Sequence, residues 1–494
     1  MDSGDPVVRT VSGSVRGRVE DDVAVFRGIP FAQPPVGSLR FAAPRPVPPW
    51  DGVRDAVHFG PPPPQSTLLP IPRTGAAPDE DPDNWLTINV WSPDPAGHQQ
   101  GLPVMVWIYG GAYRMGTASQ AGYDGSKLAK QGVVLVSFNY RLGVEGFAQL
   151  PGVPANRGLL DDVAALRWVQ DNIAGFGGDP GNVTVFGESA GAGAVACLLV
   201  MPSATGLFHR AIAQSVPGPF LSPELATSVT AAIAAAAGIA PTREAFAAFA
   251  PEALAAASDA VKPREHPEWR LLSYGDVPFA PVVDGEVLPS TPWQAVAAGA
   301  ARDVDLLTGH NRDEYRLFLE LGGLRGTITD EQATRELDAL LDDGNRLYRV
   351  AYPDASPETL YELVNSDWLF RIPTLHLAQA HAAAGGRTYL YELQYDQTAL
   401  GACHALDIPL IFGTSKELGA FLLGDPPPDS AVQLGNLMRA EWVEFARTGD
   451  PGWSPYSIGR RLTRIYDQEP DVTPYPEHAS MHLWDQRRLG ILDL

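Results

Sequence analysis

Residues 183–193 read Val-Thr-Val-Phe-Gly-Glu-Ser-Ala-Gly-Ala-Gly, and this stretch decides the fold. Its first four residues form an apolar run without alternation, which is typical of a strand buried on both faces of a parallel sheet. The small residues that follow predict a slim helix over residues 190–199. Gly187 and Gly191 flank Ser189 where a side chain would clash between a closely packed strand and helix. The stretch therefore predicts a strand, a sharp turn at Ser189 and a helix.

The turn matches the motif G-x-S-x-G, which presents a serine hydroxyl at the end of a sheet strand. Five residues alone are a weak signal, but the strand before them and the helix after them are the context that the motif requires. The alternative interpretation is a glycine-rich turn that carries a solvated serine. The context favours Ser189 as a nucleophile.

Further patterns extend the prediction outward from this turn. We expect strands over residues 104–108, 133–138, 304–309 and 388–393, and helices over residues 161–173, 226–237, 243–249, 251–261 and 431–448. The succession of strand, helix and strand predicts an α/β fold with a mostly parallel central sheet flanked by helices. Residues 7–11 and 23–26 are expected to pair as a small antiparallel hairpin, and the proline-rich residues 61–85 to form a loop near the site. No repeat or linker interrupts the pattern, so residues 1–494 are expected to form one domain.

Length, charge and cysteine usage limit the possible partners. The 494 residues are 45% hydrophobic, which is enough for a large core, and the formal net charge of −22 disfavours nucleic acid. No apolar run reaches the roughly 18 residues of a membrane span, and the polar first residues carry no secretory signal, so we expect a cytoplasmic protein. Cys197 and Cys403 have no metal-binding or redox spacing, so neither a metal nor another cofactor is expected. The oligomeric state stays open.

A glycine-rich loop follows the strand expected at residues 104–108. Acyl transfer develops negative charge on the substrate carbonyl oxygen, and backbone N–H groups must meet that charge. Gly110, Gly111 and Ala112 form the candidate loop, and Ala190 offers a further N–H directly after the serine. A simple Gly-Gly turn is the alternative. The spacing indicates an oxyanion hole.

The chain resembles the type-B carboxylesterases, the group that contains the cholinesterases and the bacterial para-nitrobenzyl esterases. The residues that carry this resemblance run almost end to end, at positions 26–32, 34–37, 39–41, 89–91, 176–191, 206–215 and 281–285. The resemblance implies an α/β-hydrolase fold and a serine carboxylesterase that hydrolyses small-molecule esters through an acyl-enzyme.

The resemblance also implies the remaining site residues. Residues 309–314 look like the family's acid loop, which places the acid at Glu314 and leaves Asp313 as its rival. Residues 403–409 look like the family's histidine loop, which places the base at His404. The oxyanion donors and the supporting residues then fall on Gly111, Ala112 and Ala190, and on Gly110 and Ser215.

The chain departs from the family pattern at several of these positions. Many members carry glycine where this chain has Ala112, Tyr315 and Val216. The alanine still offers its backbone N–H to the oxyanion hole. Val216 directly follows Ser215, and it leaves the supporting role of Ser215 open. Glu188 is expected to be a buried structural carboxylate.

Three other functions stay open at this point. The same site could cleave amides, carbamates or lactones, it could serve a bulky specialised ester, or the fold could be a non-catalytic, cholinesterase-like interaction module.

Overall fold

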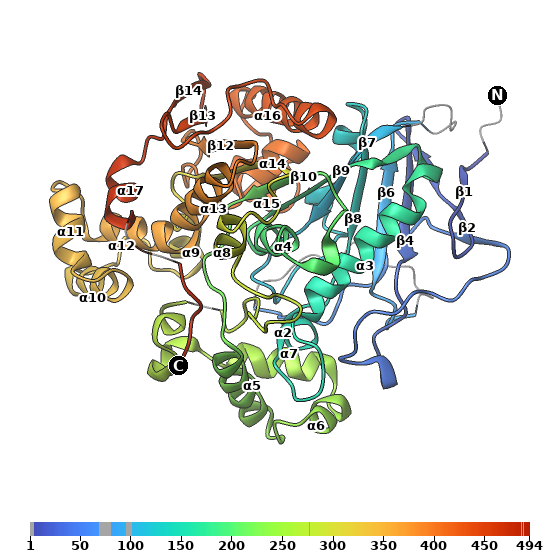
Figure 1. Ribbon diagram of the computed structural model, residues 1–494, viewed down its shortest axis with the longest axis horizontal. Coiled ribbons are helices and arrows are strands. Elements are labelled where there is room, and N and C mark those ends of the chain that lie inside the picture. The colour runs from blue at the N-terminus through green and yellow to red at the C-terminus, as the bar shows by residue number, and fades with distance from the viewer. Residues whose placement is uncertain (1–3, 69–80, 95–100, 276, 486, 488) are drawn as a thin grey trace.

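The apolar run before the serine lies in β9 (Gly178–Glu188), near the middle of a large sheet. The computed structural model describes residues 4–68, 81–94, 101–275, 277–485, 487 and 489–494, and within them this sheet has eleven strands (Figure 1). In spatial order these are β14 (Asp471–Pro474), β13 (Leu462–Tyr466), β12 (Thr388–Leu393), β11 (Asp305–Asn311), β10 (Arg210–Gln214), β9, β7 (Leu102–Ile108), β8 (Val134–Phe138), β6 (Thr87–Ser92), β4 (Val23–Pro30) and β3 (Arg18–Glu20).

The strands from β13 to β8 run parallel to one another, and the strands at both edges are antiparallel. Every residue of β8 is buried, as are the six residues that end β7. Side chains alternate between the two faces of a strand, so burial at successive positions means that both faces are covered. The predicted mixed α/β architecture with a mostly parallel sheet is confirmed.

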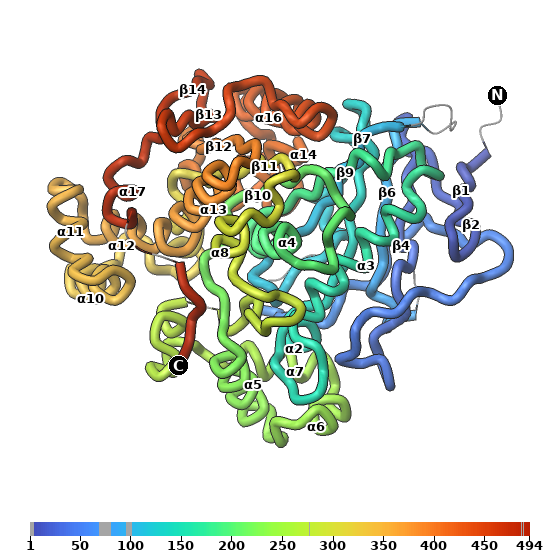
Figure 2. Tube along the Cα trace, viewed as in Figure 1, coloured from blue at the N-terminus to red at the C-terminus, as the bar shows by residue number. Residues whose placement is uncertain are grey.

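Helices cover this sheet and extend beyond its end. They are α1 (Ser126–Ala129), α2 (Gly143–Phe147), α3 (Arg157–Asn172), α4 (Ala190–Leu198), α5 (Pro223–Ala237), α6 (Arg243–Ala248), α7 (Pro251–Ala260), α8 (Pro292–Ala297), α9 (Arg316–Leu321), α10 (Asp330–Leu340), α11 (Gly344–Ala351), α12 (Pro357–Ser366), α13 (Ile372–Ala383), α14 (Asp407–Phe412), α15 (Leu418–Leu423), α16 (Asp429–Thr448) and α17 (His478–Trp484). Figure 2 shows α5, α6 and α7 together at the lower end of the molecule, and α10, α11, α12 and α17 together at the left. In the described part of the chain, no helix combines the length and the apolar character needed to cross a membrane.

The two N-terminal segments that were expected to pair with each other pair with other strands instead. β1 (Val7–Arg9) pairs with β2 (Ser14–Arg16) and β4 pairs with β3, so residues 7–11 and 23–26 do not pair with each other. β1 and β2 also form a separate small sheet with β5 (Val53–Asp55). The reason is a two-residue turn at Asp21 and Asp22, whose positive φ values of 47° and 65° suit a tight hairpin between β3 and β4.

Helix α3 begins at Arg157, four residues before the expected start. Asp161 therefore lies inside the helix, where it is fully buried and 2.8 Å from the Nη2 atom of Arg141. Acidic residues are common in the first turn of a helix, but Asp161 does not lie there. Its carboxylate is instead paired with the buried guanidinium of Arg141.

The expected loop over residues 61–85 is described only in part, because residues 69–80 lie outside the described residues. Its first portion lies against the segment that follows the glycine loop. Gln65 accepts a 3.0 Å hydrogen bond from the backbone N–H of Gly116 and donates another to the Gly116 carbonyl.

Candidate active site

Ser189 lies in the turn between β9 and α4, with φ 57° and ψ −124°. The turn is held by hydrogen bonds from the Ser189 N–H to the carbonyl of Gln214 and from the Gly193 N–H to the carbonyl of Ser189, both 2.9 Å. A Cβ atom on Gly191 would lie 2.0 Å from the carbonyl oxygen of Ile108. Helix α4 and the neighbouring strand β7 therefore approach so closely that only glycine fits at this position. The sequence predicted the need for glycine, but from the packing of the helix against the strand before the serine. Ser189 is half-buried between fully buried neighbours.

Glu314 and His404, predicted from loops far apart in the sequence, are in contact. The Oε2 atom of Glu314 lies 2.6 Å from the Nδ1 atom of His404. The other oxygen, Oε1, accepts hydrogen bonds from the Ser215 hydroxyl at 2.6 Å and from the Asn311 N–H at 2.8 Å. The Glu314 side chain is fully buried and the His404 side chain is 5% exposed. Two hydrogen bonds thus orient the carboxylate and direct it at the imidazole.

Glu188 was expected to be only structural, but it faces the same imidazole. Its Oε1 atom lies 3.1 Å from the Nε2 atom of His404. Burial raises the pKa of Glu188 to about 8, although His404 acts in the opposite direction. Burial lowers the pKa of His404, but the charges of Glu188 and Glu314 raise it more, to about 9. The imidazole therefore stands between two carboxylates, and the position of Glu188 directly before the serine is the one sequence signal that could have indicated this.

Asp313, the rival acid, makes other contacts. Its Oδ2 atom accepts a 3.1 Å hydrogen bond from the Ala402 N–H and lies within 3.1 Å of the guanidinium groups of Arg312 and Arg316. Burial raises the pKa of Asp313, but the two arginines outweigh it, and the pKa is lowered. The structure brings Glu314 to His404 and places Asp313 in an ion-pair cluster.

The predicted oxyanion loop lies against the serine turn. A Cβ atom on Gly110 would lie 3.0 Å from the Cβ of Ser189. Gly111 has φ 119° and Ala112 has φ 55°, and the Gly111 carbonyl accepts from two later N–H groups in a tight turn. Across the described residues, the N–H groups of Gly111 and Ala112 donate to no backbone or side-chain acceptor. Ala190 is the first residue of α4, where helix N–H groups have no intrahelical partner.

Two phenylalanines not predicted from the sequence flank His404. The ring of Phe370 stacks on the imidazole with centroids 4.2 Å apart, and the Phe318 ring lies 5.2 Å away. Phe370 belongs to a single π-helical turn, η7 (Asp367–Arg371), a rare conformation that occurs often at functional sites. No local sequence pattern indicates such a turn.

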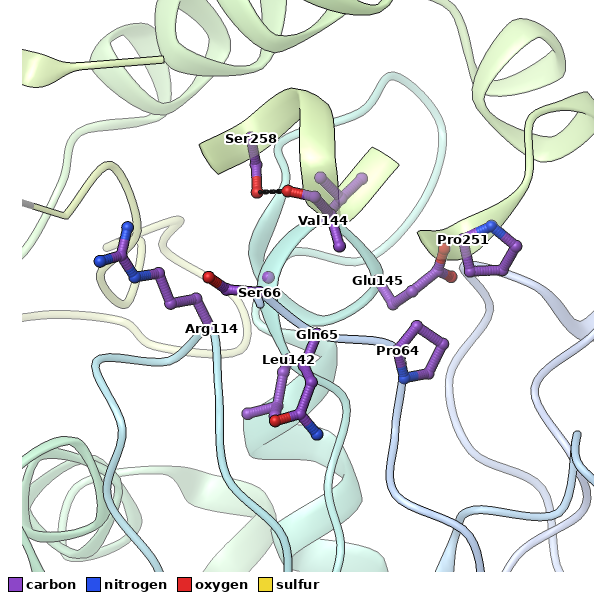
Figure 3. Close-up of a pocket in the computed structure, with 11 residues that line it drawn as sticks. Pro64, Gln65, Ser66, Arg114, Leu142, Val144, Glu145, Pro251 and Ser258 are labelled. Atoms are coloured by element: carbon purple, nitrogen blue, oxygen red, sulfur yellow. Dashed lines mark hydrogen bonds between the residues drawn. The ribbon is translucent and has the colours of Figure 1, made fainter. Parts of the chain in front are cut away.

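Figure 3 shows a separate small pocket. It is bounded by the start of the 61–85 loop, by Arg114 and by residues of α2 and α7. None of the predicted site residues lines this cavity, so it is distinct from the serine site.

A serine on a strained strand-to-helix turn of a mostly parallel sheet, directly after a glutamate that contacts a buried carboxylate–imidazole pair, defines the class: a serine hydrolase with the α/β-hydrolase fold. The family model described as the carboxylesterase family matches residues 4–458, and the chain belongs to this family. It is a carboxylic ester hydrolase.

Individual relatives agree with this assignment. The chain is 37% identical to the para-nitrobenzyl esterase of Bacillus subtilis strain 168, over 95% of this chain and 96% of that protein. It is 34% identical to mouse liver carboxylesterase 1, over 90% and 86%. Among solved structures, a thermophilic PNB esterase superposes with a TM-score of 0.84 at 36% identity, covering 97% of this chain and all of that one. The carboxylesterase EST55 of Geobacillus stearothermophilus at pH 6.2 gives a TM-score of 0.83 at 35% identity, covering 97% and 99%.

Proposed function

We propose that Ser189, His404 and Glu314 form a catalytic triad that hydrolyses small carboxylic esters through an acyl-enzyme. The observation that carries this proposal is the 2.6 Å contact between Glu314 Oε2 and His404 Nδ1, made by two buried side chains. In this arrangement the Glu314 carboxylate holds the proton on Nδ1, so that Nε2 is the atom that exchanges a proton with the reacting groups.

The reaction proceeds in two halves. His404 takes the hydroxyl proton of Ser189 as the serine oxygen attacks the ester carbonyl carbon, and the charged oxygen is bound by the N–H groups of Gly111, Ala112 and Ala190. His404 then gives its proton to the departing alcohol, which leaves an acyl-serine. Water, deprotonated by His404, attacks this ester, and the carboxylic acid is released with Ser189 restored.

Ser189→Ala tests the nucleophile. We expect kcat on a short aryl ester to fall by about 10⁶-fold, the scale seen when a catalytic serine is lost, while the thermal unfolding midpoint stays near that of the parent. Mass spectrometry after treatment with an organophosphate should find the label on the peptide that contains Ser189. Full activity in Ser189→Ala would refute the proposal. A panel of paired ester and amide substrates should show faster cleavage of each ester.

Two further properties are part of this proposal. Residues 1–494 act as one domain, supported by a main sheet whose strands come from residue 18 through residue 474. The protein works in the cytoplasm, supported by Cys197 and Cys403, which are both buried and free. A single cooperative unfolding transition and cell fractionation test these two points.

A further inference from the structure

The peptide bond that precedes His404 is held at both ends by the acid loop, residues 309–314. Its carbonyl oxygen, that of Cys403, accepts a 2.7 Å hydrogen bond from the Nδ2 atom of Asn311. Its N–H, that of His404, donates to the carbonyl of Glu314 at 3.2 Å. Two opposed hydrogen bonds fix the plane of this peptide and with it the direction in which the imidazole leaves the backbone.

Asn311 connects the same peptide to the acid. It is the last residue of β11 and is fully buried. While its side chain holds the Cys403 carbonyl, its backbone N–H donates to Oε1 of Glu314 at 2.8 Å. One residue, anchored at the end of a buried parallel strand, therefore sets the positions of both the carboxylate and the imidazole.

The side-chain amide of Asn311 serves this contact alone. Its Oδ1 atom is buried and has no hydrogen-bond partner in the described part of the chain. The hydrogen bond that the Asn311 side chain donates is therefore the one to the histidine loop, residues 403–409.

We propose that Asn311 is a positioning residue, which aligns His404 with Glu314 by clamping the peptide bond between Cys403 and His404. The inference rests on the proposed roles of Glu314 and His404 and adds the element that keeps them in register. Asn311 acts only through these two residues, so it controls the rate of proton transfer and leaves substrate binding unchanged.

Asn311→Leu removes the donor at nearly constant volume. We expect kcat on a short aryl ester to fall by about 10²-fold, as displacement of a catalytic group by about 1 Å can do, with KM within twofold of the parent. The acidic limb of the kcat/KM profile should move to lower pH, because an imidazole held less closely to Glu314 binds its proton less tightly. The serine side chain in Asn311→Ser is too short to reach the Cys403 carbonyl, so this variant should show the same fall in kcat and the same shift in pH profile. It replaces Asn311→Leu in the test if the leucine variant does not fold.

Asn172→Leu is the matched control. Asn172 is also buried, and its Nδ2 atom donates to the carbonyl of Trp168 at 2.8 Å, in α3. We expect this variant to lose thermal stability but to keep kcat and the pH profile. Parent-like kcat and pH profile in a folded Asn311 variant, or equal losses in Asn172→Leu, would overturn the inference.

Glu314→Gln distinguishes an error in the proposed role of Asn311 from an error in the proposed triad. If Glu314→Gln and Ser189→Ala keep full activity, the triad proposal itself is wrong. If both variants are inactive while the Asn311 variants match the parent, only the proposed role of Asn311 is wrong.

Discussion

Replacing Glu188 by glutamine should shift the pH dependence of the enzyme in a defined direction. The variant keeps the shape of the side chain but removes the negative charge 3.1 Å from His404 Nε2. A catalytic base must be neutral, so the activity rises as the pH passes upward through the pKa of His404. That pKa is raised from 6.5 to about 9, in part by Glu188. Without this charge the acidic limb should move to lower pH.

The size of the shift follows from the two carboxylates that share the imidazole. A rise in pKa from 6.5 to about 9 corresponds to roughly 3 kcal/mol, at about 1.4 kcal/mol for each pKa unit. Burial opposes this rise, so the two carboxylates together contribute more than the net value. Even at the dielectric constant of water, a unit charge at the 3.1 Å distance of Glu188 contributes at least about 1 kcal/mol. The acidic limb should therefore move down by about one pH unit.

The assay is kcat/KM for a short aryl ester between about pH 5 and pH 10 at constant ionic strength, since this ratio reports the pKa of the free enzyme. Glu392→Gln is the matched control. Glu392 is likewise fully buried with a pKa raised to about 8, but it lies 3.7 Å from His310. A limb that stays in place or moves upward in Glu188→Gln, or an equal shift in Glu392→Gln, would refute the reasoning.

Two other variants test the geometry around the serine and the acid. Gly191→Ala places a methyl group 2.0 Å from the carbonyl oxygen of Ile108 and should lower the thermal unfolding midpoint sharply. Gly459→Ala is the control, because its methyl group would have no atom within 4 Å, and its midpoint should match that of the parent. Equal midpoints in the two variants would contradict the close approach at Gly191. Ser215→Ala removes a 2.6 Å bond to the buried carboxylate of Glu314 and should lower the free energy of unfolding by about 1.5–3 kcal/mol in urea titrations, along with kcat. No change in either quantity would show that the bond contributes nothing.

The expected strands and helices agree with the structure where the pattern is long and local. The strand at residues 388–393 has the bounds of β12, and the helix at residues 431–448 differs from α16 by two residues. These elements carry their own signal, because apolar runs and helical spacing follow from which faces must be buried. The N-terminal pairing failed because a tight turn at Asp21 and Asp22, and not the apolar pattern, chooses the partners.

The sequence by itself determined the serine turn. Its strand, glycines and small-residue helix are contiguous, so the close approach of Gly187 to Gly191 can be inferred from the motif alone. The atoms that exclude a side chain at Gly191 belong to Ile108 and Tyr109, which only the folded sheet brings there. The resemblance to known esterases added Glu314 and His404, and the structure places these two residues in contact.

Only the tertiary structure decided what surrounds His404. The contacts made by Glu188, by Phe370 and by Asn311 through Cys403 join segments that are far apart in the chain. Such contacts depend on the register of parallel strands and on the course of the loops that leave them, and neither leaves a periodic trace in the sequence. Hydrophobic burial therefore makes the sheet predictable from the sequence, whereas the hydrogen bonds that align the imidazole exist only once the sheet has brought the loop ends together.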